Sequence, residues 1–140
     1  MLRTSFLHIP GVGVRTEQRL WSAGCLDWAS CRENPELIRP GIRRTIMPWL
    51  DNSARALERQ DACFFAELLP ANQLWRMYPE FRHKCLFFDI ETTGLGSPDD
   101  YVTTIATFDG RRVRTFVHGK NLDEFPDYLA TFPLIVTYSN

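Results

Sequence analysis

The chain has 140 residues, of which 44% are hydrophobic and 24% are charged, and its formal net charge is −1. This length suffices for one ordinary domain, or for a small module and part of another, and the composition is that of a globular protein. No apolar run approaches the roughly 18 residues of a membrane helix and no signal-peptide pattern is present, so we expect a cytoplasmic protein without a membrane partner.

Charge is distributed unevenly along the chain. Residues 1–50 contain seven arginines and four acidic residues, whereas residues 85–140 contain four basic and eight acidic residues. A basic first part is typical of phosphate binding and an acidic last part of metal binding. The cysteines show no Cys-x-x-Cys spacing, so we expect reduced core thiols and neither a zinc site nor a redox motif at Cys25, Cys31, Cys63 and Cys85.

Residues 1–33 are expected to form a small helical module. The sequence predicts a short helix over residues 4–9, a tight Pro-Gly-Val-Gly turn at residues 10–13, and a second helix over residues 14–23 that Gly24 terminates. This order of helix, glycine turn and helix resembles the helix-hairpin-helix module, which binds a nucleic-acid backbone without reading the bases.

The turn of this module supplies the candidate phosphate-binding residues. Glycines let a backbone approach a phosphate closely, and the amides of the turn and of the next helix's first residues are anion donors. Arg15 and Arg19 lie one helical turn apart and add positive charge. The candidate contacts to nucleic acid are therefore Gly11, Val12, Gly13, Arg15 and Arg19. The alternative is a helical hairpin whose glycines only make the turn.

Residues 34–83 are expected to be a helical connector. Before it, a short helix over residues 26–31 packs a tryptophan against the hairpin. Within it, the arginine pair at residues 43–44 is expected in an irregular connection, followed by a long helix over residues 51–69 that is capped at its first residues. A second helix follows over residues 72–79.

The most informative stretch is an apolar strand that delivers two carboxylates. Residues 85–88 are apolar and aromatic, as in a buried strand, and Asp89 and Glu91 follow at its carboxyl end. Side chains two residues apart share a face of a strand, so these like charges repel unless a cation neutralises them. A pair of Mg²⁺ or Mn²⁺ ions at such carboxylates can activate water for phosphodiester hydrolysis. The alternative is a strand that ends in solvated acids.

The remaining residues predict the rest of a sheet. A loop over residues 96–100 carries two acids that are expected to be loop-tip residues, not metal ligands. Strands over residues 101–108 and 111–118 are joined by a two-residue Asp-Gly hairpin. A helix over residues 121–131 then leads to an apolar strand over residues 134–138, parallel to the first. The expected class is α+β, with a helical module followed by a three-stranded antiparallel meander, a helix and a parallel strand.

The motif Asp-Ile-Glu-Thr-Thr-Gly-Leu, at residues 89–95 behind the apolar strand, resembles the first acidic motif of the DEDD-type 3′-5′ exonucleases of the ribonuclease H-like superfamily. Over nearly the whole chain, the order of elements is similar to that of bacterial ribonuclease H-like domain proteins of the YprB type, in which a helix-hairpin-helix precedes an exonuclease-like domain. The segments that carry this resemblance are Phe6–Trp28, Trp75–Pro79, Phe88–Leu95 and Val136–Asn140.

The resemblance implies a metal-dependent nuclease acting on DNA or RNA, with residues 84–140 as a partial ribonuclease H-like domain. In it, Asp89 and Glu91 would be catalytic and would hold two ions, Mg²⁺ or Mn²⁺. The residues that would lie beside the 3′ end of the strand are Thr92, Thr93 and Leu95.

The chain departs from this family because it contains neither of the later acidic motifs. We therefore expect an incomplete domain that cleaves weakly or not at all, completed by another polypeptide or by a longer parent. The histidines are expected to be structural or solvated and not a general base. Three functions remain open: an exonuclease, a non-catalytic nucleic-acid-binding module, and a protein-interaction fragment that pairs through its sheet edge.

Overall fold

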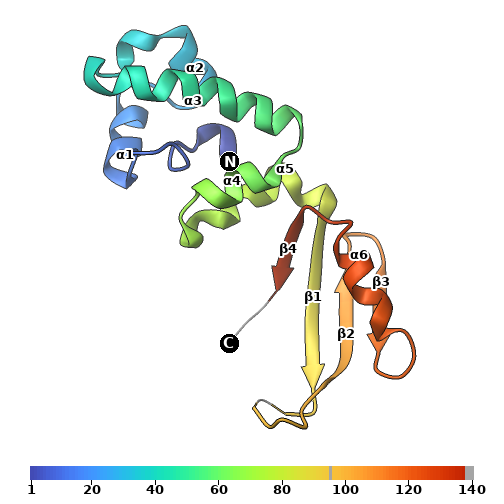
Figure 1. Ribbon diagram of the computed structural model, residues 1–140. Coiled ribbons are helices and arrows are strands. Elements are labelled where there is room, and N and C mark those ends of the chain that lie inside the picture. Colours follow the sequence, from blue (N-terminus) through green and yellow to red (C-terminus); the bar gives the residue numbers. More distant parts are fainter. Residues whose placement is uncertain (95, 138–140) are drawn as a thin grey trace. The chain divides into compact units, whose positions relative to one another are not determined.

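The computed structural model describes residues 1–94 and 96–137 (Figure 1). The chain divides into two compact units, Met1–Glu80 and a second unit that begins at Phe81. Within the described residues the fold contains six α-helices and one four-stranded mixed sheet, which confirms the predicted α+β class. No helix in these two ranges has the length and apolar character needed to cross a membrane.

The first unit consists of helices and 3-10 segments. Its α-helices are α1 (Val14–Ser22), α2 (Trp28–Glu33), α3 (Pro40–Glu58) and α4 (Ala62–Leu68). Its 3-10 segments are Leu2–Thr4, Pro35–Leu37 and Ala71–Met77. The short helix α5 (Tyr78–Phe81) and a 3-10 turn, Arg82–Lys84, lead into the first strand.

Two of the predicted helices are confirmed, with the ends that local sequence favours. Gly13 is the N-cap of α1, and Gly24, at φ +99°, follows its C-terminal end. At α2, Asp27 and Ser30 form a reciprocal capping box, in which each side chain accepts a hydrogen bond from the other residue's backbone N–H. Trp28 is buried at the start of α2, as expected.

The helix predicted over residues 4–9 is wrong. In residues 1–13, all of which the structure describes, Leu2–Thr4 form one 3-10 turn and only turns follow. The cause is tertiary. The buried carboxylate of Glu17 accepts hydrogen bonds from the backbone N–H of Phe6 (2.7 Å) and from the hydroxyl of Ser5 (3.2 Å). This segment therefore satisfies its backbone through α1 and not through a helix of its own.

The connector also differs from the prediction. The arginine pair at residues 43–44 lies inside α3, which begins at Pro40 and runs through residues 51–52. Pro40 occupies the first turn, where its missing N–H leaves no bond unmade. Pro48 lies inside the helix on its exposed side. The core-facing positions of α3 recur at helical spacing: Ile46, Leu50, Ser53 and Leu57.

The expected long helix over residues 51–69 is divided in two. Gln60 adopts φ +57° after α3, and the side chain of Asp61 then accepts a hydrogen bond from the N–H of Phe64 (3.1 Å) as the N-cap of α4. The helix expected over residues 72–79 is replaced by the 3-10 segment Ala71–Met77 and the start of α5.

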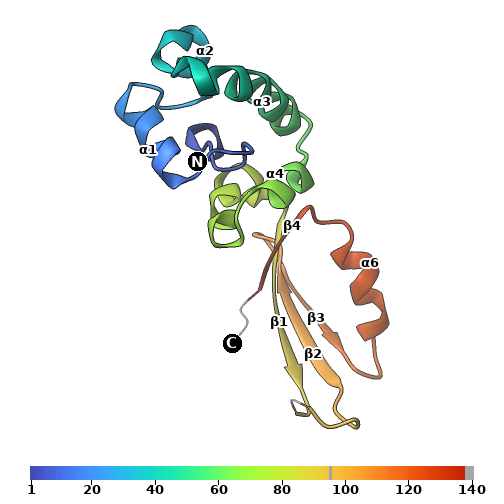
Figure 2. The ribbon, with the colours of Figure 1, turned by 60° about the vertical axis from the view of Figure 1, so that its left-hand side comes forward.

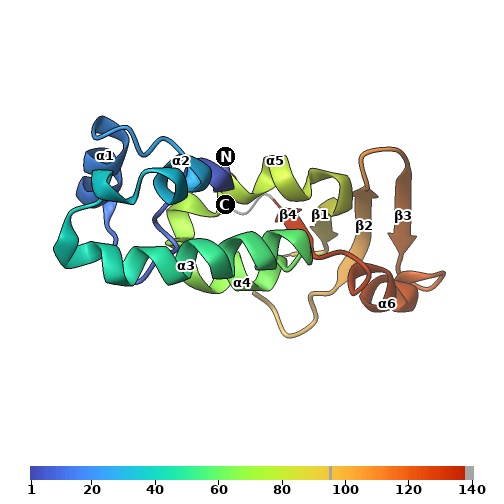
Figure 3. The ribbon, with the colours of Figure 1, turned by 90° about the horizontal axis from the view of Figure 1, so that it is seen from above.

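The second unit is built on a sheet of four strands. They are β1 (Cys85–Thr92), β2 (Val102–Phe108), β3 (Val113–Val117) and β4 (Leu134–Thr137), in the order β3-β2-β1-β4. Figure 3 shows the four strands side by side in this order. β1 pairs antiparallel with β2 and parallel with β4, and β2 pairs antiparallel with β3. The predicted meander and parallel strand are confirmed over the described residues.

The loop between β2 and β3 is longer than predicted. Phe108 pairs with Val113, so four residues form the turn instead of two. The carboxylate of Asp109 accepts hydrogen bonds from the N–H groups of Arg112 (2.7 Å) and Arg111 (2.8 Å). These donors lower the pKa of Asp109. The side chain of the turn's first residue therefore replaces the tight backbone turn.

One face of the sheet carries the core of this unit. The helix α6 (Phe125–Leu129) lies against it (Figure 2), and Phe125 packs with Ile105 and Phe116. The opposite face has an apolar hollow of about 500 Å³. Strand alternation places four of its apolar lining residues on this face: Phe87, Phe108, Val113 and Val136. The described helix of this unit, α6, lies on the other face and does not cover this hollow.

Candidate functional site

The two candidate metal ligands lie on the central strand of the sheet. Asp89 pairs with Ala106 and Glu91 pairs with Thr104, so both acids lie inside β1 and not beyond its end. Alternation places both on the face opposite the α6 core, with their Cα atoms about 6.6 Å apart along the strand. The expectation of a buried strand holds only for its first half, because Cys85 and Leu86 are buried whereas Asp89 and the residues after it are exposed.

A β-bulge fixes the backbone beside these acids. The register shifts between Glu91, which pairs with Thr104, and Thr92, which pairs with Val102, so Thr103 is the extra residue. The Thr103 hydroxyl donates a hydrogen bond to the carbonyl of Glu91 (3.0 Å). Bulges commonly re-aim side chains next to active sites. Here the bulge lies directly at the second candidate ligand.

The two carboxylates fit a hard divalent cation as part of its ligand set. Both side chains are exposed, and neither accepts a hydrogen bond from any described residue. Unpaired carboxylate oxygens of this kind are the donors that Mg²⁺ and Mn²⁺ prefer. Within residues 1–94 and 96–137, no three or more His, Cys, Asp or Glu side chains are grouped so that they could hold one metal ion. Asp89 and Glu91 could therefore supply two ligands, and a complete two-ion centre would require others.

The loop after β1 is organised around Asp100. Its carboxylate accepts hydrogen bonds from the N–H groups of Ser97 (2.7 Å) and Gly96 (2.9 Å). A Cβ atom at Gly94 would lie only 2.5 Å from the same carboxylate. Asp100 therefore closes the loop.

Two of the residues predicted to contact a 3′ end, Thr92 and Thr93, form hydrogen bonds within this loop. The Thr92 hydroxyl donates to the carbonyl of Gly94 (2.7 Å), and the Thr93 hydroxyl accepts from the N–H of Tyr101 (3.1 Å). Both threonines are exposed. The third predicted contact, Leu95, lies outside the described residues.

The glycine turn of the first unit presents part of the predicted phosphate site. Gly11, at φ +80°, and Gly13 are exposed, and a Cβ atom at either would meet nothing within 4 Å. Among the described residues, the N–H groups of Gly13, Val14 and Arg15 have no acceptor. These are the free donors at the start of α1 that can bind an anion.

Val12 differs from the prediction. Its side chain is buried and its N–H donates to the carbonyl of Ile9 (3.0 Å), so neither group is available to a nucleic acid. Arg15 and Arg19 are exposed on α1, as the proposed contact requires. Arg19 additionally lines a pocket with Arg39. No local pattern indicated a role for Arg39, because the fold and not the sequence spacing brings it to Arg19.

Only some of the histidines and cysteines are buried: His8, Cys25, Cys31 and Cys85. Burial lowers the pKa of His8 to about 4, whereas His83 and His118 are exposed. Burial, followed by a hydrogen bond with Cys25, raises the pKa of Cys31. Cys63 is exposed, so the expectation of a core thiol is wrong there.

The comparisons with known proteins bear on the second unit. No curated protein sequence matches the chain, and no solved structure matches it. Residues 86–140 match the family model of the RNase H superfamily. The matched segment contains Asp89 and Glu91 and four strands of the expected order. This match supports a ribonuclease H-like domain in the second part of the chain.

Proposed function

We propose that the chain is part of a metal-dependent nuclease of the DEDD type, which hydrolyses phosphodiester bonds of DNA or RNA from the 3′ end. The observation that carries the proposal is the pair Asp89 and Glu91, exposed on one face of the central strand within a segment that matches the RNase H superfamily. In this role the two carboxylates hold Mg²⁺ or Mn²⁺. The metal would supply an activated water and stabilise the leaving oxygen.

The residues around this pair have supporting roles in the proposal. The bulge at Thr103 would orient Glu91, since the Thr103 hydroxyl binds the Glu91 carbonyl. Thr92 at the end of β1 and Thr93 after it would contact the 3′ end of the strand. The proposal requires further metal ligands from outside the described residues, because two carboxylates alone do not complete a two-ion centre. We therefore expect this chain alone to bind the ion but to cleave nucleic acid weakly or not at all.

Mn²⁺ binding tests the metal site without depending on activity. In an NMR titration of the whole chain, Mn²⁺ should broaden the amide signals around residues 89–92 first, since the ion is paramagnetic and bound there. Asp89→Asn should remove this broadening, whereas Asp99→Asn, which changes an exposed acid of the neighbouring loop, should leave it. Broadening that is equal in both variants would show that the ion binds elsewhere.

Cleavage is tested on a 3′-labelled single strand with Mn²⁺. The chain is compared with a version extended through the next downstream reading frame, each with and without Asp89→Asn. Activity confined to the extended protein and lost on substitution supports the exonuclease. If neither version cleaves DNA or RNA, the result would favour a second candidate function.

That second candidate is a non-catalytic nucleic-acid-binding module. It is favoured by the free N–H groups at the start of α1 and by Arg15 beside them. Such contacts hold a backbone and carry no sequence information. Arg15→Gln should weaken binding of single strands of any sequence by a similar factor and reduce the salt dependence, whereas unchanged binding would remove the turn from the interface.

A further inference from the structure

A pocket between α1 and the start of α3 shares only Arg19 with the candidate contacts described above. Its volume is about 340 Å³, and it lies wholly within the first unit. One wall is formed by α1 and the residue that follows it. Thr16, Arg19 and Leu20 lie on one face of α1, at the spacing i, i+3, i+4, and Ser22 and Ala23 complete the wall. The other wall consists of Leu37, Arg39 and Ile42, around the first turn of α3.

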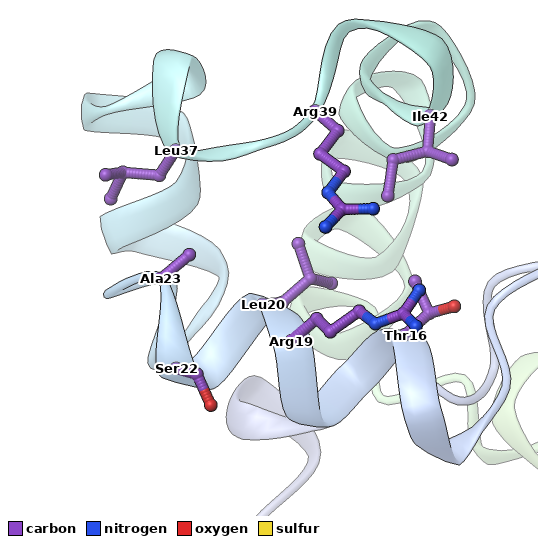
Figure 4. Close-up of a pocket in the computed structure, with 8 residues that line it drawn as sticks. All are labelled: Thr16, Arg19, Leu20, Ser22, Ala23, Leu37, Arg39 and Ile42. Atoms are coloured by element: carbon purple, nitrogen blue, oxygen red, sulfur yellow. The ribbon is translucent and has the colours of Figure 1, made fainter.

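Two guanidinium groups extend into this pocket from opposite walls. Figure 4 shows Arg39 reaching toward Leu20 from the start of α3 and Arg19 extending along α1 toward Thr16. None of the lining residues is acidic. Among the described residues, neither Arg19 nor Arg39 has a hydrogen-bond or ion-pair partner. Two unneutralised like charges in one pocket repel each other, and a bound anion would remove this repulsion.

Two neighbouring arginines of the same unit form hydrogen bonds or ion pairs within it. Arg43 donates two hydrogen bonds to the carbonyl of Ile38, at 2.9 and 3.2 Å, and Arg32 forms an ion pair with Asp51 (2.8 Å). The pocket arginines make no such contact within the described residues. Their guanidinium groups therefore remain available to a ligand.

The rest of the lining selects the kind of anion. Leu20 is buried at the floor, and Leu37 and Ile42 are partly buried beside it. An apolar floor accommodates a flat or carbon-rich group, whereas guanidinium groups bind phosphate oxygens in a bidentate manner. A volume of about 340 Å³ lies at the lower end of the range for small-molecule sites. A nucleotide has both parts, a phosphate and a base with its sugar.

We propose that this pocket binds one nucleotide, with Arg19 and Arg39 on its phosphate and the apolar floor under its base and sugar. The nucleotide is either a unit of a nucleic-acid strand or a free mononucleotide. The first alternative rests on the proposed function, and it adds a second phosphate contact to that at the glycine turn. The second alternative is independent of it.

The test uses Arg39→Gln, because Arg39 is not among the residues proposed for the glycine turn. The matched control is Arg44→Gln, which removes an exposed charge from the same helix outside the pocket lining. Binding of a labelled single strand to the whole chain is followed by fluorescence anisotropy at several salt concentrations. Loss of one charge-assisted contact should weaken binding roughly tenfold and lower the salt slope by about one, with a much smaller effect of the control.

A second variant and a second ligand distinguish the pocket proposal from the proposed nucleic-acid-binding function. Ala23→Glu adds a carboxylate to the exposed rim and should weaken binding more than Arg39→Gln. Adenosine monophosphate is titrated into the labelled chain, and shifts of the amides of Thr16, Leu20 and Ile42 report occupancy. Shifts without any strand binding would assign the pocket to a free mononucleotide and would contradict the nucleic-acid module.

The pocket proposal is overturned by one combination of results. If Arg39→Gln and Arg44→Gln affect strand binding equally, and adenosine monophosphate leaves the pocket amides unchanged, the pocket takes no nucleotide. The metal site at β1 and the glycine turn would stand, because Asp89→Asn and Arg15→Gln test them separately.

Discussion

The two units differ in the burial and the partners of their polar side chains. In the first unit, Glu17 and His8 are buried, and each is held by partners from distant parts of the sequence. In the second unit, Asp89 and Glu91 are exposed on the sheet without a described partner. Buried paired groups fix a structure, whereas exposed unpaired carboxylates remain free for a ligand. The first unit therefore holds its buried polar groups in fixed contacts, whereas the second leaves the two candidate ligands without a described partner.

The apolar side chains show a similar contrast. The first unit surrounds His8 with aromatic rings, and Trp28 and Phe65 stack with ring centroids 6.1 Å apart. The sheet of the second unit is covered by α6 on one face, while Val113 on the other is 71% exposed. The second unit therefore has less buried apolar area to oppose the loss of chain entropy.

The units can be followed separately in solution. All four tryptophans lie in residues 1–80, so tryptophan fluorescence reports on the first unit. Hydrogen exchange of the amides in β1 and β2 reports on the second unit.

The largest expected effect is that of Glu17→Ala. The Glu17 carboxylate accepts two hydrogen bonds from Arg76, at 2.9 and 3.1 Å, besides those from Ser5 and Phe6. Its removal leaves a largely buried guanidinium and an unpaired backbone N–H, so the free energy of unfolding of the first unit should fall by about 3–5 kcal/mol. Urea unfolding followed by tryptophan fluorescence measures this loss.

The control for this prediction is Gln18→Ala, an exposed neighbour on the same helix, which should change stability little. In a double-mutant cycle, Glu17→Ala with Arg76→Ala should destabilise by less than the sum of the single variants, since the second removes the unpaired charge. A loss below about 1 kcal/mol for Glu17→Ala alone would mean that the network does not hold the first unit together.

A somewhat smaller effect is expected from the titration of His8. Ser53 donates its only hydroxyl proton to the carbonyl of Trp49 (2.6 Å), so His8 Nε2, 2.7 Å away, must carry the proton of that contact. His8 Nδ1 is then an unpaired buried acceptor, and a second proton there would find no partner among the surrounding rings. Burial therefore lowers the pKa of His8 to about 4 from its ordinary value of 6.5.

The direction of the pH effect follows from this lowered pKa. Between pH 6.5 and 4 the unfolded chain binds a proton at this residue and the folded chain does not, so stability is full above pH 6.5 and falls as the pH drops. The loss should approach roughly 3 kcal/mol at pH 4. His8→Phe should remove this part of the pH dependence, and equal pH profiles of both proteins would contradict it. Tryptophan fluorescence in urea at each pH gives the measurement.

The parts of the fold that local sequence predicted are those whose signals are local. Gly24 after α1 marks a helix end by its own backbone chemistry, and this end was predicted. The short helix expected over residues 26–31 is present, but it begins after Asp27, which is its N-cap. In the second unit, apolar strands and a turn beginning at Asp109 gave the order of elements, although the length of that turn was wrong. Alternation along β1 also placed Asp89 and Glu91 on one face.

The parts that sequence did not predict depend on distant residues. Residues 4–9 contain suitable caps but are not helical, because the distant Glu17 carboxylate binds the N–H of Phe6 and the hydroxyl of Ser5. The helix expected from residue 51 begins instead at Pro40, and Pro48 inside it lies on the exposed side of α3. The pocket arginines are 20 positions apart in the chain and meet only through the packing of α1 and α3.

A moderate effect is expected at the loop beside the candidate metal site. Gly94→Ala would place a methyl group 2.5 Å from Asp100, which the N–H groups of Ser97 and Gly96 hold in place. Displacing that carboxylate should cost about 1–3 kcal/mol of local stability. Hydrogen exchange of the Ser97 amide should accelerate, whereas Asp99→Ala in the same loop should leave it nearly unchanged. Unaltered exchange in Gly94→Ala would show that the loop does not depend on Asp100.

The smallest expected effect is that of Asp27→Ala at the N-cap of α2. The Asp27 carboxylate accepts a hydrogen bond from the Ser30 N–H (2.8 Å), and this donor is the largest cause of its lowered pKa. Losing the cap should destabilise the first unit by about 1 kcal/mol, while Asp27→Asn should retain most of it because asparagine caps nearly as well. Because the folded pKa is lowered, the charged cap's contribution is present above the unfolded pKa and is lost as the pH falls through the lowered value. The asparagine variant should lack this acid dependence in tryptophan-monitored unfolding, and an identical acid profile would assign the effect to another carboxyl group.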